Sequence, residues 1–340
     1  MCSSDLAFRR LYSDPLKPAL DKTIAGAYPP GSTFKPFTAL AALEKGLINP
    51  RAATQCRGAI TFGKRSFRCT HVHGPVELHK AIAQSCNVYF YWLASELGVG
   101  MDVIAEMGQR FGLGTRTGLG VSAEAAGRMP TRAWMTLHNK GQFRLGFGLN
   151  AAIGQGATTV TVLQLALAYA ALANGGTLYQ PQIVRAVETS AGTVVQEFTP
   201  RVRRQVDVSP ENLSLVQKAL FAGVNEEHGT ANKARLVGVD VSGKTGTAQV
   251  SHKLARGAEA ERVWYFNREH AWFAGYSPSR SPEVAVVVLI EHGGAGGKHA
   301  APVAMEVVAA YNKLFRERGA PRAGTSLPGR TPAKAAGGAP

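Results

Sequence analysis

Apolar side chains recur every three or four residues in two segments of the first half of the chain, a spacing typical of helices. The first helix is expected to begin near Ser32, directly after a Tyr-Pro-Pro-Gly turn, and to end at Gly46. Pro36 belongs to its first turn, because a proline deeper inside a helix costs about 3 kcal/mol or more. The second helix is expected over residues 78–97. The pattern therefore places Ser32 at the start of a helix.

Turn residues dominate the segments around these helices. A hairpin is expected around Gly63, and residues 111–157 are glycine-rich and expected to be irregular. A third helix ends at Ala173, where an Asn-Gly-Gly sequence stops it, and either Thr158 or Thr159 can cap its start.

The second half of the chain changes to the pattern of strands. Residues 239–250, 270–276 and 283–291 are each predicted to form a strand. The last of these is apolar throughout 284–290, which favours a strand buried on both faces. An amphipathic helix over 300–315 is expected to pack against the sheet. This order indicates an α+β fold, with an antiparallel sheet packed by helices and a helical subdomain inserted before it.

The composition is that of a globular protein, since 45% of the 340 residues are hydrophobic and 18% are charged. The formal net charge is +15, but the basic residues are scattered and do not alternate with aromatic residues in one run. Nucleic acid is therefore not expected as a partner. No stretch reaches the roughly 20 apolar residues of a membrane helix, and no signal peptide is recognisable.

Three regions are expected along the chain. Residues 1–11 are interpreted as a non-native or truncated start, because they join to nothing recognisable. Residues 12–317 are expected to form one domain. Residues 318–340 consist mostly of Pro, Gly and Ala with a few basic residues and no acidic ones, which predicts a flexible basic tail.

The first chemical signal is the pair formed by Ser32 and Lys35. A serine hydroxyl is a poor nucleophile until a base removes its proton. An offset of three residues places Lys35 on the same helix face as Ser32. Lysine acts as a base only when its amine is neutral, so burial or nearby cations must lower its pKa. The free amides at a helix start can in addition stabilise an oxyanion.

A second signal lies in the predicted strand that contains Lys244 and Gly246. No glycine-rich phosphate loop precedes Lys244, so a nucleotide-binding Walker motif is excluded. A strand that carries a cation, and a glycine that permits close approach, suit an extended peptide ending in a carboxylate. Two structural alternatives stay open, namely a simple bulge at Gly246 and a solvated edge lysine at Lys244.

These residues, together with Ser85 and Asn87, form three motifs in order, Ser-x-x-Lys, Ser-x-Asn and Lys-Thr-Gly. The set resembles that of penicillin-binding proteins and serine β-lactamases. The sequences flanking it, Tyr-Pro-Pro-Gly-Ser-Thr-Phe-Lys-Pro, Ile-Gly-Gln-Gly and Gly-Lys-Thr-Gly-Thr-Ala-Gln, resemble the penicillin-binding protein 2 family, the transpeptidases of cell elongation. So does the glycine-rich segment 293–302. The resemblance covers roughly residues 12–317, and it implies the penicillin-binding transpeptidase fold shared with serine β-lactamases.

The resemblance implies a role for each motif residue. Ser32 is expected to be the acylated nucleophile and Lys35 its general base. Ser85 and Asn87 are expected to relay protons and to hold the substrate amide, while Lys244 assists electrostatically. The donor stem peptide of peptidoglycan would lose its terminal D-Ala as the acyl-enzyme forms, and an amine from a neighbouring strand would complete the cross-link.

Substrate binding is assigned to the same strand by the resemblance. Thr245 and Thr247 are expected to contact the carboxylate of the substrate or of a β-lactam antibiotic, with Gly246 between them. Backbone amides of Ser32 and Thr247 are expected to form the oxyanion hole. One such donor accounts for roughly 100- to 1000-fold in rate.

The resemblance also implies surroundings that the sequence does not contain. Members of the family carry a membrane helix and a non-catalytic pedestal before the catalytic domain. The parent protein is therefore expected to be anchored at the periplasmic face of the inner membrane and to work with a membrane glycosyltransferase of the elongation complex.

Four potential metal ligands, Cys56, Cys69, His73 and Cys86, lie within 31 residues of one another, with His71 as a spare. Three thiolates and one imidazole suit a tetrahedral structural zinc ion. The alternative is a disulfide between Cys56 and Cys69, with Cys86 as a packed thiol. An oxidising periplasm favours the disulfide, whereas a metal accounts for all four positions.

Two rival functions stay open. A serine β-lactamase would share the motifs, but 212 residues separate Ser32 from Lys244, a long span for that compact family, and no glutamate motif for a deacylating water is evident. A non-catalytic β-lactam sensor or scaffold would keep the fold without the chemistry, yet no motif residue is missing.

Overall fold

The computed structural model describes residues 3–121, 123–250 and 260–315. Within them, the α-helices are α1 (Ser3–Ser13), α2 (Lys35–Glu44), α3 (Leu78–Ala83), α4 (Asn87–Ser95), α5 (Met101–Arg110), α6 (Arg132–His138), α7 (Leu145–Ala152), α8 (Val162–Ala173), α9 (Pro210–Asn225), α10 (Ala260–Asn267) and α11 (Gly296–Phe315). Two short 3-10 helices are η1 (Gly31–Phe34) and η2 (Asn232–Ala234). The strands are β1 (Thr54–Cys56), β2 (Ala59–Phe62), β3 (Arg65–Arg68), β4 (Gly74–Val76), β5 (Thr177–Gln180), β6 (Ala186–Glu188), β7 (Val194–Glu197), β8 (Arg201–Gln205), β9 (Ser242–Ala248), β10 (His270–Ser277) and β11 (Val284–Ile290).

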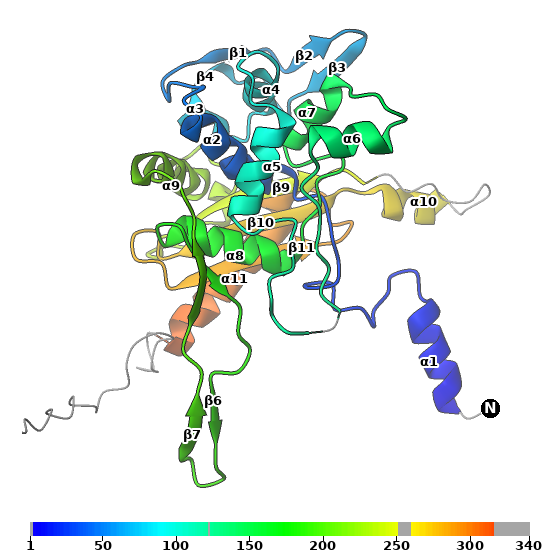
Figure 1. Cartoon of the computed structure of the whole chain (residues 1–340), viewed down its shortest axis with the longest axis vertical. Coiled ribbons are helices and arrows are strands. Elements are labelled where there is room, and N and C mark those ends of the chain that lie inside the picture. The colour runs from blue at the N-terminus through cyan, green and yellow to red at the C-terminus, as the bar shows by residue number, and fades with distance from the viewer. Residues whose placement is uncertain (1–2, 122, 251–259, 316–340) are drawn as a thin grey trace, which may run out of the picture.

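The centre of the molecule is an antiparallel sheet in the order β11-β10-β9, with helices on both faces (Figure 1). Side chains of β10 alternate between two apolar clusters. Trp272 and Tyr276 join the cluster that includes α8, whereas Phe273 joins the cluster formed with α11. Since successive strand residues point to opposite faces, α8 and α11 cover opposite sides of the sheet. The α+β fold with an antiparallel sheet packed by helices is confirmed.

The strand buried on both faces is β10, and the expectation that 284–290 would be this strand is wrong. Every residue of β10 is buried, although its sequence is less apolar than that of β11. Only Val286 of β11 is buried, and its other residues are partly exposed. The reason is position, because β11 is an edge strand of this sheet and β10 lies at its centre.

Helix α2 is enclosed by other helices and packs mainly against α5 and α9, with α3 and α4 also in contact (Figure 1). Its residues from Lys35 to Leu43 are all buried. A helix that is buried all round belongs to the interior and not to a surface layer. Ser32 precedes α2 and lies in η1. The predicted helix start at Ser32 is therefore a 3-10 turn that leads into α2.

The single helix expected over 78–97 is wrong, since the chain forms α3 and α4 with a corner at Ser85. Ser85 has a φ of 60°, a left-handed conformation that an unbroken helix excludes. Apolar spacing continues across the corner, and therefore periodicity alone does not reveal it.

Three smaller predictions from the sequence are wrong in part. Residues 111–157 contain α6 and α7 and are not irregular throughout. Helix α8 is capped by Thr161, whose side chain accepts the Gln164 amide proton in a capping box, and not by either of the two preceding threonines. The strand expected over 239–250 is shorter and is β9. The hairpin around Gly63 is confirmed as β2 and β3, and residues 318–340 lie outside the described part of the chain.

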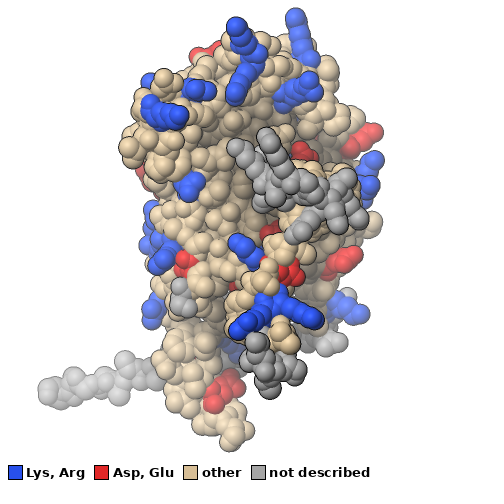
Figure 2. All heavy atoms as spheres, turned by 90° about the vertical axis from the view of Figure 1, so that its right-hand side faces the viewer, with Lys and Arg blue, Asp and Glu red and all other residues tan. Residues whose placement is uncertain are grey.

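Charged side chains are distributed over the surface. Figure 2 shows Lys and Arg in separate small groups on the face turned to the viewer, with Asp and Glu between some of them. This face carries no continuous basic surface of the kind that binds a nucleic-acid backbone. Among the described helices, none combines the length and the apolar character needed to cross a membrane.

Candidate active site

Ser32 lies at the surface of a cleft, on a turn that is held from both sides. Gly31 donates its N–H to the carbonyl of Gly154 at 2.9 Å and has a φ of 55°, which glycine adopts without strain. A Cβ atom at Gly31 would lie 2.8 Å from the carbonyl oxygen of Thr247. Ser32 is partly exposed, while its neighbours Gly31 and Thr33 are buried. The turn thus presents the serine to the cleft and brings it against β9.

Lys35, three residues after Ser32, is fully buried, and its ammonium has a complete set of acceptors. Nζ donates to the Ser85 carbonyl at 2.8 Å, to the Ser85 hydroxyl at 3.1 Å and to Asn87 Oδ1 at 2.7 Å. Burial lowers the pKa of Lys35 to about 8, against an opposing effect of the nearby Cys69 and Cys86 charges. The predicted base therefore lies within reach of both residues of the second motif, and its neutral form is accessible near neutral pH.

Ser85 and Asn87 occupy the corner between α3 and α4. The positive φ of Ser85 turns its carbonyl and its hydroxyl toward the same ammonium. A left-handed serine costs of order 1–3 kcal/mol, and such strain is found where function requires a particular geometry. Asn87 also donates Nδ2–H to the Arg68 carbonyl at 3.1 Å and its backbone N–H to Cys69 Sγ at 3.1 Å. The corner is therefore tied to the segment that follows β3.

Lys244 points into the interior, and the alternative of a solvated edge lysine is wrong. Its side chain is fully buried, and Nζ donates to the Thr245 carbonyl at 3.2 Å. Burial, and then the charge of Lys35, hold the pKa of Lys244 well below its usual value. Two buried lysines that repel each other do not readily both carry a charge. A bound carboxylate would favour the charged form of Lys244.

The remainder of β9 forms one wall of the site without a bulge. Gly246 pairs with Trp272 in a continuous register, so the bulge alternative is wrong. A Cβ atom at Gly246 would lie 2.9 Å from Thr33 Cγ2 and 3.0 Å from the Pro30 carbonyl oxygen. Glycine is therefore required by the close approach of the Ser32 turn to β9.

Two neighbours fix Thr247, the last motif residue. Gln155 Nε2–H donates to the Thr247 carbonyl at 3.2 Å, and the Gly296 N–H donates to Thr247 Oγ1 at 3.4 Å. Gln155 belongs to the Ile-Gly-Gln-Gly sequence, so this motif supports the strand at Thr247, which lines the cleft.

The cleft has a volume of about 1200 Å³. The motif residues on its surface are Ser32, Ser85, Asn87, Thr245, Gly246 and Thr247. Lys35 and Lys244 lie beneath this surface. The structure thus brings together all the residues predicted for chemistry and substrate binding. Sequence reasoning missed cleft residues outside the motifs, among them Arg68, Tyr91, Thr230 and Lys298, which carry no local signal.

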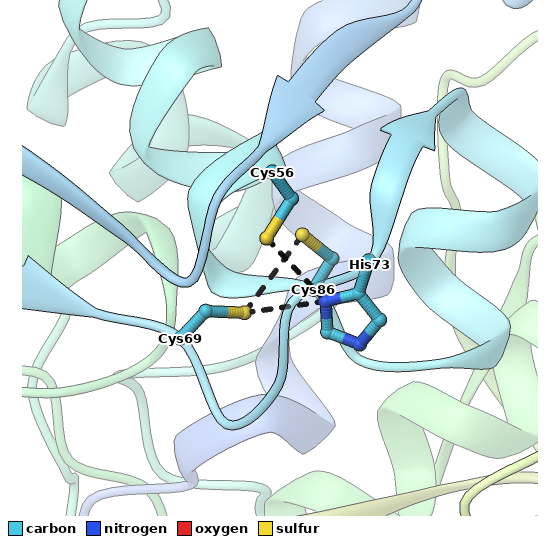
Figure 3. Close-up of side chains that lie close together, drawn as sticks. All are labelled: Cys56, Cys69, His73 and Cys86. Atoms are coloured by element: carbon cyan, nitrogen blue, oxygen red, sulfur yellow. Dashed lines mark hydrogen bonds between the residues drawn. The ribbon is translucent and has the colours of Figure 1, made fainter.

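Cys56, Cys69, His73 and Cys86 converge beside the active site (Figure 3). Their ligand atoms all lie within 4.8 Å of one another. Nδ1 of His73 is 3.5 Å from Cys56 Sγ and 3.5 Å from Cys69 Sγ, and Cys69 Sγ is 3.9 Å from Cys86 Sγ. The predicted ligand set is therefore one cluster. The spare ligand His71 is exposed and is not a member of it.

Three of the distances within this cluster match the edges of a tetrahedral zinc site, and the other pairs of ligand atoms lie within 4.8 Å of each other. With Zn–S bonds of about 2.3 Å and Zn–N bonds of about 2.0 Å, the edges of the tetrahedron are about 3.8 Å between sulfurs and about 3.5 Å between sulfur and nitrogen. The three cysteines are free thiols in the structure. Hydrogen bonds, first from Cys86 and then from backbone amides, lower the pKa of Cys69. This favours the thiolate form, which metals require.

The family model of the penicillin binding protein transpeptidase domain matches residues 7–309. The chain therefore belongs to the penicillin-binding protein transpeptidase family, as the motifs indicated.

Relatives place it within that family. It is 32% identical over 313 residues to the peptidoglycan D,D-transpeptidase MrdA of Haemophilus influenzae, a match that covers 89% of this chain and 47% of that protein. It is 31% identical over 321 residues to the peptidoglycan D,D-transpeptidase PbpA of Mycolicibacterium smegmatis, covering 89% of this chain and 59% of that protein. The chain spans about half the length of these curated relatives.

Solved structures of penicillin-binding proteins have the same fold as this chain. The structure of PBP2 of Pseudomonas aeruginosa in complex with WCK 5153 superposes with a TM-score of 0.73 at 32% identity, covering 90% of this chain and 63% of that one. The complex of PBP2 and MreC from Helicobacter pylori gives a TM-score of 0.77 at 26% identity, covering 93% of this chain and 55% of that one. The penicillin-binding transpeptidase fold is thereby confirmed.

Proposed function

We propose that this chain is the catalytic part of a peptidoglycan D,D-transpeptidase of cell elongation, with Ser32 as its nucleophile. The observation that carries the proposal is the hydrogen-bonded group of Lys35, Ser85 and Asn87, buried under a serine that opens into a cleft against β9. This group supplies the base, the proton relay and the amide anchor that acyl transfer needs.

The first half-reaction is acylation. Neutral Lys35 takes the proton of Ser32, and the serine oxygen attacks the carbonyl carbon of the penultimate D-Ala of a stem peptide. The oxyanion is held by the backbone amides of Ser32 and Thr247. Ser85, which shares a hydrogen bond with Lys35, passes a proton to the leaving nitrogen, and the terminal D-Ala departs.

The second half-reaction reverses these roles. The amine of a neighbouring stem peptide attacks the ester carbonyl, and its proton passes to the Lys35–Ser85 pair. The bond to Ser32 then breaks as the serine oxygen takes a proton back from this pair, which leaves Lys35 neutral again. Asn87 holds the substrate amide, and Thr245 and Thr247 bind the substrate carboxylate beside Lys244. No step needs a metal or an organic cofactor.

Inhibition by β-lactams follows from the same geometry, because a β-lactam presents a strained amide and a carboxylate to the same groups. One structural relative, at 26% identity, is the ceftriaxone acyl-enzyme complex of penicillin-binding protein A from M. tuberculosis. This supports a stable acyl-serine here rather than rapid hydrolysis. A serine β-lactamase and a non-catalytic sensor or scaffold are the alternatives that the experiment below addresses.

We further propose the boundaries and surroundings of the domain. Residues 12–317 are proposed to form the transpeptidase domain, a range that agrees closely with the residues 7–309 matched by the family model. The parent protein is anchored at the periplasmic face of the inner membrane and works with a membrane glycosyltransferase. Two structural relatives, a PBP2–MreC complex and a peptidoglycan synthase complex, support such an assembly.

A structural zinc ion is the proposed ligand of the Cys56, Cys69, His73 and Cys86 cluster. Its support is the tetrahedral spacing of the four ligand atoms. Cys86 lies between Ser85 and Asn87, and Cys69 Sγ accepts the Asn87 N–H. Zinc at this site would therefore hold the corner that positions Lys35. It would act on structure, and would not take part in the acyl transfer.

The test of the proposed function is a turnover assay with a stem pentapeptide ending in D-Ala-D-Ala and an acceptor amine. The parent chain should release D-Ala and form the cross-linked product, while Ser32→Ala should do neither. Fast turnover of penicillin, without a lasting adduct, would point to a β-lactamase instead. Covalent labelling by penicillin, with no D-Ala release from any stem peptide, would favour the sensor.

A further inference from the structure

Thr230, which belongs to none of the three motifs, touches the hydroxyl of a motif residue. Thr245 Oγ1 donates a hydrogen bond to Thr230 Oγ1 at 2.7 Å. Thr245 is 7% exposed, and both threonines lie on the surface of the cleft. Thr230 comes from the turn between α9 and η2 and is separated from Thr245 by 15 positions in the sequence. A hydroxyl from outside β9 therefore contacts the residue proposed to bind the substrate carboxylate.

The turn that carries Thr230 is held firmly on several sides. The Thr230 N–H donates to the Ala83 carbonyl at 3.3 Å, and the Ala231 N–H donates to the Gly223 carbonyl at 2.9 Å. A Cβ atom at Gly229 would lie 2.5 Å from the Ala222 carbonyl oxygen, and one at Gly297 would overlap the Thr230 carbonyl oxygen.

Helices α3, α9 and α11 thus enclose this turn. Such close backbone packing leaves little freedom to move Thr230 away from β9. The backbone of Thr230 is consequently held by the fold at the place from which its hydroxyl reaches Thr245.

The contact between the two hydroxyls affects how Thr245 can bind a carboxylate. Each threonine hydroxyl has one proton and can also accept. When a carboxylate binds, Thr245 needs its single proton for that anion, and it can then accept the proton of Thr230. A heavy-atom separation of 2.7 Å serves either direction of donation. A donor behind Thr245 also polarises its hydroxyl and so strengthens the bond to the anion.

We propose that Thr230 is a positioning residue for carboxylate recognition, which acts through Thr245 by fixing its hydroxyl and donating to it when substrate is bound. The proposal rests on the function proposed above, in which Thr245 binds the carboxylate of stem peptides and β-lactams. It predicts that Thr230 matters only for acylating agents that carry this carboxylate.

The experiment compares benzylpenicillin with its methyl ester, which lacks the negative charge. For each compound, the second-order rate constant of acylation is measured by intact-mass spectrometry on the parent, Thr230→Val, Thr230→Ser and Thr245→Val. Valine keeps the shape of threonine without its hydroxyl, and serine restores the hydroxyl. Circular dichroism melts establish that each variant is folded.

Thr230→Val should slow acylation by the free acid roughly 5- to 30-fold, the effect of one hydrogen bond to a charged system. Acylation by the ester should change less than about twofold, and Thr230→Ser should stay near the parent with both compounds. The double variant Thr230→Val/Thr245→Val should be no slower than Thr245→Val alone, because the two residues act as one unit.

Equal losses with acid and ester would assign Thr230 a purely structural role and overturn the proposal, as would an unchanged rate with the acid. Should valine prevent folding, Thr230→Ala and Thr230→Ser decide by the same comparison of acid and ester. A parent chain that forms no adduct at Ser32 with either compound contradicts the proposed function itself. Normal acylation of the parent with an indifferent Thr230→Val contradicts only the role of Thr230.

Discussion

The pH dependence of acylation gives a quantitative test of Lys35 as the general base. Its pKa of about 8, lowered from 10.5 by burial, means that about one tenth of the amine is neutral at pH 7 and about nine tenths at pH 9. Only the neutral amine takes the serine proton. The acylation rate constant should therefore rise about tenfold from pH 7 to pH 9 and level off above the pKa.

The magnitude of this effect follows from the depth of burial. A lysine at its usual pKa of 10.5 would be neutral in only about 0.03% of molecules at pH 7. The buried amine thus offers about 300-fold more base at that pH. The ammonium form is satisfied by its three acceptors on Ser85 and Asn87, so the gain comes from burial and not from missing hydrogen bonds.

The assay is stopped-flow acylation by a chromogenic cephalosporin between pH 6.5 and 9.5 at constant ionic strength. Lys35→Arg keeps the positive charge but cannot become a neutral base, so it should be as damaging as Lys35→Ala. Lys45→Arg, at the other end of α2 and exposed, is the matched control and should behave as the parent. A rate that is flat between pH 7 and 9, or an arginine variant within a few-fold of the parent, would refute Lys35 as the base.

Three further predictions concern the surroundings of the site. Ser85→Gly should raise the free energy of unfolding by about 1 kcal/mol in urea titrations, because glycine adopts the positive φ without strain. The same variant should slow acylation at least ~100-fold, whereas Ser85→Ala should slow acylation without gaining stability. Gly296→Ala should lower the free energy of unfolding by roughly 2–3 kcal/mol, because its Cβ would overlap the Gly246 and Trp272 carbonyl oxygens. The control Gly148→Ala, with open space around it, should not lower it, and equal effects of the two variants would contradict this packing. Elemental analysis should find about one zinc per chain, and chelation should expose the cluster thiols to alkylation, lower stability and slow acylation together. A Cys56–Cys69 linked peptide from metal-free, fully active protein would end the zinc proposal.

The sequence predicted which residues meet at the cleft better than it predicted the backbone geometry that brings them there. The motifs identified the residues around the cleft, because acyl transfer constrains residue type and order directly. Local spacing did not predict the corner at Ser85, since apolar periodicity continues through it while the backbone changes to a positive φ. The position of Thr230 opposite Thr245 depends on how three helices pack, and no short-range pattern records that.

The fold shows the same division. The antiparallel sheet and the final helix followed from hydrophobic patterning, and the structure confirms them. The order β11-β10-β9 did not, and the most apolar strand, which was expected to be buried on both faces, lies at an edge and is mostly only partly buried. An apolar run reports how much surface a strand buries against helices. It does not report how many strands flank it.

The cluster of Cys56, Cys69, His73 and Cys86 illustrates what tertiary packing adds to two alternatives that a sequence leaves open. Spacing along the chain was compatible with zinc or with a disulfide. Convergence of all four ligand atoms to within 4.8 Å favours the metal, because a Cys56–Cys69 bridge would leave His73 and Cys86 without a reason to lie there.

The central claim is that Ser32 is the nucleophile, and one measurement tests it most directly. Parent protein and Ser32→Ala are incubated with benzylpenicillin, and their intact masses and tryptic peptides are recorded. The parent should gain one penicilloyl group on the peptide that contains Ser32, while the folded alanine variant should gain none. A stoichiometric adduct on folded Ser32→Ala, or an adduct of the parent at another residue, would contradict the account.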